Sequence, residues 1–256
     1  MIISVVTISF NDLAGLRKTR ASLESQILHD GLSVEHIVVD GGSSDGTVEF
    51  LSGKSGIHWI SEPDRGRYDA MNKGLARAVG DFVWLMHAGD TFGGDASLVT
   101  AARAMESSPT GWGYGLARKV DGESCVGIFG NVPFDLRRFA LGGRPIPHQA
   151  TIVSRSVLDN VGDYDLSHGL AADQLYLLKC ALVSEPVVIA EFLCNFDVTG
   201  AGSTRPAHLH YVDMRRAANR CHYSPTGKRL LDLAISFALQ TLAVVKRRAA
   251  RADTLK

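Results

Sequence analysis

Short apolar runs alternate with helix-like segments through the N-terminal part of the chain, and this alternation most constrains the fold. Residues 1–8 are nearly all apolar and rich in β-branched side chains, as in a strand buried on both faces. Residues 81–86 form a second apolar run. Strands that alternate with helices over short links predict an α/β fold with a mostly parallel sheet and right-handed crossovers. The other strands are expected at residues 35–40, 57–60, 150–153 and 186–190, and residues 111–129 are expected to form a strand or a hairpin. Helices are expected near residues 13–26, 48–52, 69–79, 96–106, 170–182, 207–221 and 226–248.

Length and composition bound the number of domains and the class of partner. The chain has 256 residues, 45% of them hydrophobic, which suits one α/β domain with a C-terminal elaboration. Its 27 basic and 27 acidic residues cancel, which argues against a nucleic-acid binder. Four widely spaced cysteines show no zinc-binding spacing and are expected to be reduced and mostly buried. The strand-like start predicts no secretory signal, and hence a cytoplasmic protein or one at the cytoplasmic face of the plasma membrane.

A carboxylate ends the second predicted strand. Asp40 closes the run 35–40 and is followed by the pair Gly41-Gly42. Open α/β sheets bind ligands at the carboxyl ends of their strands, where Asp40 would accept a hydrogen bond from a base or a ribose. The alternative, an Asp that caps its own glycine turn, has equal weight. The glycine pair matches neither a dinucleotide fingerprint nor a P-loop, which disfavours a dinucleotide enzyme or a kinase.

Residues 64–74 carry a dense cluster of charges. The segment reads Asp-Arg-Gly-Arg-Tyr-Asp-Ala-Met-Asn-Lys-Gly. Cations beside carboxylates suit a phosphate ligand held with a divalent metal. Lys73 follows Asp69 by four residues, so a helical ion pair would account for those two. That alternative leaves Asp64 and Arg65 unexplained, and we predict that they belong to a ligand site.

Asp90 follows the apolar run 81–86 and a small-residue turn. One or two carboxylates together with ligand phosphates suffice to hold Mg²⁺ or Mn²⁺, and we predict that Asp90 is a metal ligand. The alternative is an N-cap for the helix near 96–106, but Asp90 lies well before that helix. His87 is a candidate ligand or donor, although a lone histidine is more often structural.

Two polar residues of the second half are harder to interpret. Asp173 stands near the start of the helix at 170–182, where an isolated acid is usually a cap or a dipole partner. The residues alone favour that structural interpretation. His148 follows Pro145-Ile146-Pro147, whose stiff backbone fits either a binding loop or a simple turn.

The last predicted helix, at 226–248, is apolar but interrupted by polar residues. Its apolar stretch is shorter than the roughly twenty residues that a membrane span needs. Lys246, Arg247 and Arg248 end it, which fits an amphipathic helix lying on an anionic membrane. Docking on the core or on a second subunit of a homo-oligomer is an equally weighted alternative.

Together these segments resemble the family 2 glycosyltransferases. Residues 5–11, VVTISFN, are similar to that family's opening strand and loop, and residues 36–47, HIVVDGGSSDGT, are similar to its nucleotide-binding turn. Residues 61–74 resemble the subgroup that builds bacterial cell-surface polysaccharides and glycolipids, including mycobacterial transferases of phenolic glycolipid assembly and colanic-acid-type enzymes. The resemblance implies a Rossmann-like GT-A domain over residues 1–205. A C-terminal helical extension would then occupy residues 206–256.

The resemblance also implies a reaction and a role for each candidate residue. Such an enzyme moves a hexosyl or deoxyhexosyl group from a UDP-, GDP- or dTDP-sugar to a hydroxyl of a lipid-linked or saccharide acceptor. The transfer would be inverting, with Mn²⁺ or Mg²⁺ as cofactor. Asp173 would be the general base, which replaces the cap interpretation; Asp90 would anchor the metal, and His148 would face the pyrophosphate. The nucleotide-sugar site would comprise Thr7, Phe10, Asn11, Asp40, Asp64, Arg65, Asn72 and Lys73.

One departure concerns the metal motif, which usually reads Asp-x-Asp-Asp in that family. His87 and Gly89 replace its first two acids, and only Asp90 is left, so metal-assisted rather than metal-dependent chemistry stays open. Two other functions stay open as well. A nucleotidyltransferase on a related fold would usually show a glycine- and lysine-rich loop near the N-terminus, which this chain lacks. A non-catalytic nucleotide-sugar-binding protein would fit the altered motif.

Overall fold

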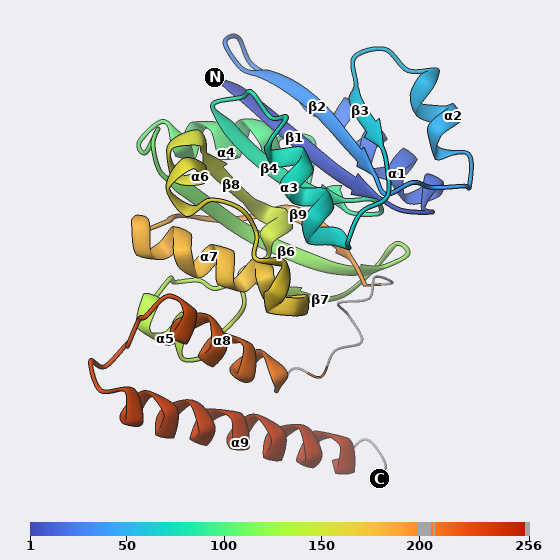
Figure 1. The fold of residues 1–256 in the computed structure, drawn as a ribbon. Coiled ribbons are helices and arrows are strands. Elements are labelled where there is room, and N and C mark those ends of the chain that lie inside the picture. The colour runs from blue at the N-terminus through green and yellow to red at the C-terminus, as the bar shows by residue number, and fades with distance from the viewer. Residues whose placement is uncertain (199–205, 207, 254–256) are drawn as a thin grey trace.

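One sheet organises the molecule. The computed structural model describes residues 1–198, 206 and 208–253, with side chains up to residue 245. Among these residues, the sheet has nine strands in the order β3-β2-β1-β4-β8-β6-β9-β5, with β7 paired to β6. Figure 1 shows helices packed on the sheet and the two last helices in a layer beneath it.

The first four strands form the parallel half of the sheet. These strands are β1 (Ile2–Ser9), β2 (Ser33–Asp40), β3 (His58–Ser61) and β4 (Phe82–His87). The helices between them are α1 (Leu13–Glu24), α2 (Thr47–Ser52) and α3 (Arg67–Leu75). Ser9 pairs with Asp40, and Asp40 pairs with Ser61, so the carboxyl ends of these strands share one edge. This half confirms the predicted alternation of strands and helices.

Beyond β4 the sheet is mixed: β8 runs antiparallel to β4 and β6, whereas β9 runs parallel to β6 and antiparallel to β5. Its strands are β5 (Thr91–Phe92), β6 (Trp112–Asp121), β7 (Ser124–Phe129), β8 (Thr151–Ser154) and β9 (Val187–Asp197). Its helical elements are α4 (Ser97–Met105), α5 (Leu136–Ala140), η1 (His148–Ala150), α6 (Arg155–Val161), η2 (Leu166–Ala171) and α7 (Ala172–Val183). The sequence predicted neither α5 nor α6. Both helices are short. Ser154 caps α6 by accepting a hydrogen bond from Val157 N–H at 3.3 Å, and a serine in this position is a sequence feature that favours the start of a helix.

The sheet separates two apolar cores. Successive side chains of a strand point to opposite faces, so β1 contributes Val6 to one core and Val5 to the other. Helices α3, α6, α7 and α8 cover the first core, and α4 covers the second. Burial of one large apolar side chain is worth roughly 1.5–3 kcal/mol, so both cores hold β1 in register. The four cysteines are free, and Cys180 and Cys194 lie in these cores.

Two helices end the described chain, α8 (Leu209–Arg220) and α9 (Arg229–Asp253). Met214 of α8 is fully buried in the first core. By contrast, α9 meets α8 through polar groups: the Arg215 guanidinium donates to Ser236 Oγ at 3.0 Å and to Gln240 Oε1 at 2.7 Å. The side of α9 that carries Ser236 and Gln240 therefore faces α8.

The opposite side of α9 is apolar and uncovered among the described residues. Leu230 is 84% exposed, Leu242 is 50% exposed and Val245 is 56% exposed. In the part of the chain that the structure describes, no helix has both the length and the apolar character needed to cross a bilayer. The side chains of residues 246–248, which carry the predicted basic cluster, lie outside the described residues.

Candidate active site

Asp40 lies at the edge where the parallel strands end, and its side chain is fully buried. Its Oδ2 accepts hydrogen bonds from the N–H groups of Gly42 (3.2 Å) and Ser43 (2.9 Å) and from Ser61 Oγ (2.6 Å). Its Oδ1 accepts a further hydrogen bond from Ser43 Oγ. The structure thus shows the turn-capping geometry that was one of the two interpretations. A contact between Asp40 and a base stays a prediction.

Three other predicted residues surround the turn after Asp40. Asn11 has a left-handed backbone (φ 49°), and its Oδ1 accepts a hydrogen bond from Ser44 N–H at 2.9 Å. A Cβ at Gly41 would lie 2.5 Å from Asp64 Oδ2 and 3.1 Å from the Phe10 ring. Glycine at this position therefore lets both side chains reach the edge. Phe10 is 63% exposed, which leaves its ring accessible to a planar ligand.

Ion pairs brace the loop between β3 and α3. Arg65 Nη2 lies 2.9 Å from Asp69 Oδ1, and the Arg65 N–H donates to Asp69 Oδ2 at 3.0 Å. The hydrogen bond from the Arg65 side chain is the main reason why the pKa of the Asp69 carboxyl is lowered. Lys73 Nζ lies 3.0 Å from Glu62 Oε1 and 3.7 Å from Asp69 Oδ2, so the helical ion pair expected as an alternative is present. Asp69 therefore positions two predicted ligand residues.

Two predicted residues lie away from this edge. Asn72 on α3 exchanges two hydrogen bonds with the Tyr164 backbone: its Nδ2 donates to the carbonyl at 3.0 Å, and its Oδ1 accepts from the N–H at 2.8 Å. Thr7 is fully buried in β1, with Oγ1 3.1 Å from His36 Nε2. The structure places Thr7 beneath the edge. It places Asn72 at a junction between α3 and the second half of the chain.

A chain of polar side chains connects the end of β4 with α7. His87 Nε2 lies 3.3 Å from His148 Nε2, and His148 Nδ1 lies 3.4 Å from Asp173 Oδ2. Burial is the largest cause that lowers the pKa of His87 well below its usual value, and His148 acts in the same direction. His87 is therefore neutral at physiological pH. Which of the two imidazoles donates depends on their tautomers.

Asp173 ends this chain of polar groups. Its Oδ1 accepts a hydrogen bond from Tyr68 OH at 3.1 Å, and its Oδ2 accepts one from Gln174 Nε2 at 3.1 Å. Burial acts to raise the pKa of this carboxyl, but the hydrogen bonds from His148 and Gln174 outweigh it, and the pKa falls to about 2. Asp173 is in the first turn of α7, yet its carboxylate faces other side chains and is ionised at neutral pH.

The sequence analysis missed Tyr68 and Gln174. The Gln174 amide is itself held by the Ile146 backbone, because Oε1 accepts from the N–H at 3.3 Å and Nε2 donates to the carbonyl at 3.0 Å. Tyr68 and Gln174 thus fix Asp173 from two sides. For Tyr68 a signal existed: it precedes Asn72 by four residues, so both lie on one face of α3. No comparable signal marked Gln174.

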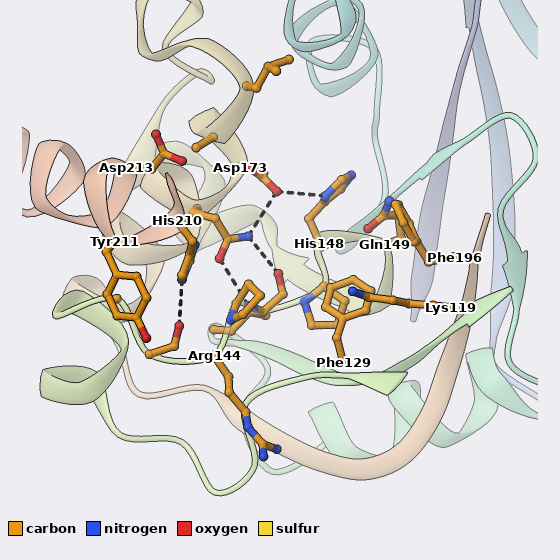
Figure 2. Close-up of a pocket in the computed structure, with 18 of the residues that line it drawn as sticks. Lys119, Phe129, Arg144, His148, Gln149, Asp173, Phe196, His210, Tyr211 and Asp213 are labelled. Atoms are coloured by element: carbon orange, nitrogen blue, oxygen red, sulfur yellow. Dashed lines mark hydrogen bonds and ion pairs between the residues drawn. The ribbon is translucent and has the colours of Figure 1, made fainter. Parts of the chain in front are cut away.

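A pocket of about 730 Å³ opens at Asp173. Its lining includes His148 and Asp173, and Figure 2 shows these two side chains joined at the head of the pocket. Phe129 and Phe196 pack edge to face on another wall, with ring centroids 5.6 Å apart. The pocket lining does not include Phe10, Asn11, Asp40, Asp64, Arg65 or Asp90. The candidate residues therefore form two groups, the strand edge and the pocket, and His87 lies between them.

Comparison with known proteins identifies the family. The chain is 44% identical over 235 residues to an uncharacterized glycosyltransferase of Mycobacterium tuberculosis (strain CDC 1551), which covers 90% of this chain and 88% of the relative. It is also 30% identical over 198 residues to a PGL/p-HBAD biosynthesis glycosyltransferase of Mycobacterium bovis, over 74% of this chain and 73% of the relative. Residues 4–115 match Glycosyl transferase family 2. The chain belongs to glycosyl transferase family 2. This glycosyltransferase is therefore an enzyme, which decides against the nucleotidyltransferase and the non-catalytic protein.

Solved structures share its fold. TarS of S. aureus (residues 1–349), solved in complex with UDP-GlcNAc, matches with a TM-score of 0.67 and 18% identity, over 92% of the glycosyltransferase and 70% of TarS. The mannosyltransferase PcManGT of Pyrobaculum calidifontis, solved with GDP-Man and Mn²⁺, matches with a TM-score of 0.65 and 21% identity, over 99% and 74% of the two chains. These likenesses confirm the predicted GT-A fold.

Asp90 was predicted to anchor the metal, which stays a prediction, and its surroundings fit a single protein ligand. It is 2% exposed, and its two carboxylate oxygens accept hydrogen bonds from Asp197 N–H at 3.0 Å and His87 N–H at 3.3 Å. Burial is the main cause that raises its pKa to about 6. Among the residues described, no group of three histidine, cysteine or acidic side chains could hold a metal. This donor set fits a cation that takes most of its ligands from a bound diphosphate.

Proposed function

We propose that the glycosyltransferase moves a sugar from a nucleoside-diphosphate sugar to a hydroxyl of a glycolipid or polysaccharide acceptor, with inversion at the anomeric carbon. Asp173 carries the proposal, because it is an ionised carboxylate that faces the pocket and is connected through His148 to the end of β4. The UDP-GlcNAc bound by TarS and the GDP-Man bound by PcManGT support a nucleotide sugar as donor. UDP-, GDP- and dTDP-sugars all fit this proposal.

The strand edge supplies the donor site. Phe10 offers an exposed ring for stacking against the base, and Asp64 and Arg65 hold the nucleotide or the donor sugar. Lys73 supports that loop from α3 through its hydrogen bond to the Pro63 carbonyl, and Asn72 acts indirectly by fixing α3 to the Tyr164 backbone. A divalent cation held by Asp90 would neutralise charge on the departing diphosphate.

The pocket supplies the acceptor side of the reaction. The acceptor oxygen forms a bond to the anomeric carbon while the bond from that carbon to the diphosphate breaks, and the nucleoside diphosphate leaves on the opposite face. The proton of the acceptor hydroxyl passes to the Asp173 carboxylate. Because the pKa of Asp173 is about 2, the carboxylate is a weak base that takes this proton as the new bond forms, not before. His148 and Tyr68 keep its oxygens in place.

Asp173→Asn tests the role of the base. A thermal-shift screen of UDP-, GDP- and dTDP-sugars with Mn²⁺ first identifies the donor, because a ligand raises stability in proportion to its affinity. With that donor, we expect the rate of nucleoside diphosphate release to fall about a thousandfold, while the donor affinity stays within about twofold. The control is Asp163→Asn, an exposed acid on the approach to η2, which should leave the rate unchanged. A folded Asp173→Asn enzyme with most of its turnover would contradict the role.

The outward face of α9 supports a peripheral contact with the cytoplasmic face of the plasma membrane. Arg215 holds the polar side of the helix against the protein, so Leu230, Leu242 and Val245 are presented outward, as in helices that lie in the bilayer interface. Flotation with anionic phospholipid vesicles tests this contact. We expect the double variant Leu230→Glu/Leu242→Glu to lose flotation.

Val79→Glu serves as the control, because Val79 is also exposed (76%) but lies in the loop before β4, far along the chain from α9. Equal flotation of all three proteins would exclude the membrane contact. A dimer in light scattering that the double variant alone dissociates would assign the face to a homo-oligomer.

A further inference from the structure

The pocket at Asp173 extends to the last helix of the chain. Its lining includes His148 and Asp173 at one end and Leu239 and Ala243 of α9 at the other. A volume of about 730 Å³ lies within the usual range of sites that enclose a whole small ligand, roughly 300–1,000 Å³. The pocket therefore has room for more than the hydroxyl that reacts.

The polar groups of the pocket are unevenly placed. His148, Asp173 and Gln174 are connected to one another at its head. Strand β7, the end of β9 and α9 contribute an apolar part of the lining, whereas α8 contributes His210, Tyr211 and Asp213. These apolar residues are Val126, Phe129, Phe196, Val198, Leu239 and Ala243. A saccharide needs hydrogen-bond partners along its length, whereas such a wall suits an alkyl chain or an aromatic ring.

The apolar wall continues onto the outer surface. Leu239, which lines the pocket, is 37% exposed, and the next outward-facing residues of α9, Leu242 and Val245, are 50% and 56% exposed. The cationic side chains at the rim, Lys119, Arg138 and Arg144, are exposed. Figure 2 shows the Arg144 guanidinium pointing away from Asp173. An apolar chain can therefore run from the reacting hydroxyl to the outer face of α9 along this wall, although Asp213 of α8, which is 2% exposed, also lines the pocket.

We infer that this part of the pocket binds the apolar aglycone of the acceptor, which is a lipid-linked hydroxyl compound and not a free saccharide. The inference rests on the proposed function, since Asp173 must be the group that meets the acceptor hydroxyl. The acyl or aryl portion lies against Phe129, Leu239 and Ala243. The hydroxyl at its polar end then reaches the Asp173 carboxylate.

Binding of octyl and methyl β-D-glucopyranoside, measured by calorimetry below the micelle concentration of the octyl compound, tests the inference. Each methylene that becomes buried should raise affinity about fourfold. If about half of the octyl chain is buried, the octyl compound should bind about a hundredfold more tightly than the methyl compound. Equal affinity for the two glucosides would overturn the inference.

Two tryptophan variants on α9 show where the octyl chain of the glucoside lies. Ala243 lines the pocket, whereas Ala238 is exposed and does not line it. We expect Ala243→Trp to abolish most of the increase in affinity from the methyl to the octyl glucoside. Ala238→Trp should keep this increase. The inference fails if Ala243→Trp keeps the gain, or if both variants lose it equally, because the chain would then lie on the outer face alone. If Ala243→Trp does not fold, Leu239→Gln replaces it with the same expectation.

A separate measurement distinguishes this inference from the proposed function. Nucleotide release from the donor sugar in water requires neither glucoside nor α9. If the native enzyme neither binds nor hydrolyses any nucleotide sugar, the proposed function fails, whatever the glucosides do. If it hydrolyses the donor but shows no preference for the octyl chain, only the lipid-linked acceptor is excluded.

Discussion

The strand edge and the pocket are built in different ways. At the edge, the polar groups are satisfied mainly by their own turns: Asp40 accepts from Gly42 and Ser43, both within three residues of it. In the pocket, Asp173 is held by Tyr68, which is 105 residues away in sequence, and by His148. The turn after Asp40 is thus formed largely by local hydrogen bonds, whereas the pocket exists only once the second half of the chain has packed on α3.

The pKa of the buried acid is shifted in opposite directions in the two regions. Burial raises the pKa of Asp90 at the edge to about 6. Burial has the same sign at Asp173, but hydrogen bonds from His148 and Gln174 outweigh it and bring the pKa down to about 2. An acid with a raised pKa gains from a cation that favours its charged form, whereas Asp173 is already ionised. This contrast is consistent with the proposed cation at Asp90, and the proposed role of Asp173 rests on its place in the pocket.

Replacing Asp90 should have the largest effect at the edge. We expect Asp90→Ala to lower the turnover about a thousandfold, because charge on the leaving diphosphate loses its counterion. Mn²⁺ titration of the folded variant with the nucleotide should show no saturable binding. Asp95→Ala, an exposed acid after β5, should behave as the native enzyme. Near-normal activity of Asp90→Ala in excess Mn²⁺ would remove Asp90 from the metal site and with it the contrast between the two regions.

Asn72 tests the junction between the regions. Asn72→Ala leaves the N–H and the carbonyl of Tyr164 without partners, and an unpaired buried polar group costs about 1–3 kcal/mol. We expect the free energy of unfolding in urea to fall by about 2 kcal/mol and the turnover to fall about tenfold, with unchanged donor affinity. Asn160→Ala breaks only a hydrogen bond within α6 and should cost about 0.5 kcal/mol or less. A loss of donor affinity in Asn72→Ala would place Asn72 in the donor site instead.

The pH dependence of metal binding sharpens the contrast. A protonated Asp90 cannot hold a cation, so below its pKa of about 6 the affinity for Mn²⁺ with nucleotide should fall about tenfold per pH unit. Above that pH the affinity should level off. Paramagnetic resonance of Mn²⁺ between pH 5 and pH 8 measures this profile. A flat profile across that range would show that Asp90 does not bind the metal.

Replacing Phe10 or Thr7 should have the smallest effects, and the two variants separate donor affinity from stability. Phe10→Ala should weaken donor binding about tenfold, since stacking of one base is worth about 1–3 kcal/mol. Thr7→Val should change donor affinity less than about twofold and affect stability alone, because Thr7 is buried against His36. Calorimetric titration of the donor nucleotide into both variants decides between them. Equal weakening would return Thr7 to the nucleotide pocket.

Local chemistry explains which features could be predicted. The strands of the parallel half and the turn after Asp40 follow from apolar runs, glycines and caps that are contiguous in sequence. Asp173 could not be distinguished from a helix cap by its residues, because its contacts with Tyr68 and His148 arise from tertiary packing. Thr7 was predicted to belong to the nucleotide-sugar site, which stays a prediction; its contact with His36 on the neighbouring strand follows from the pairing of β1 with β2. The pocket could not be predicted from the sequence either, because its lining comes from elements that include β7, β9, α8 and α9 and meet only in the tertiary structure.

The position of α9 bears on the length of the glycan that the enzyme can accept. A helix with its side chains is about 10 Å thick. Leu239 and Ala243 of α9 line the pocket, and α9 forms the layer below α8 in Figure 1. If α9 rests in the headgroup layer, the Asp173 carboxylate stays at a fixed and short height above the lipid. Only a glycan of one or a few sugars would then present its terminal hydroxyl at that height.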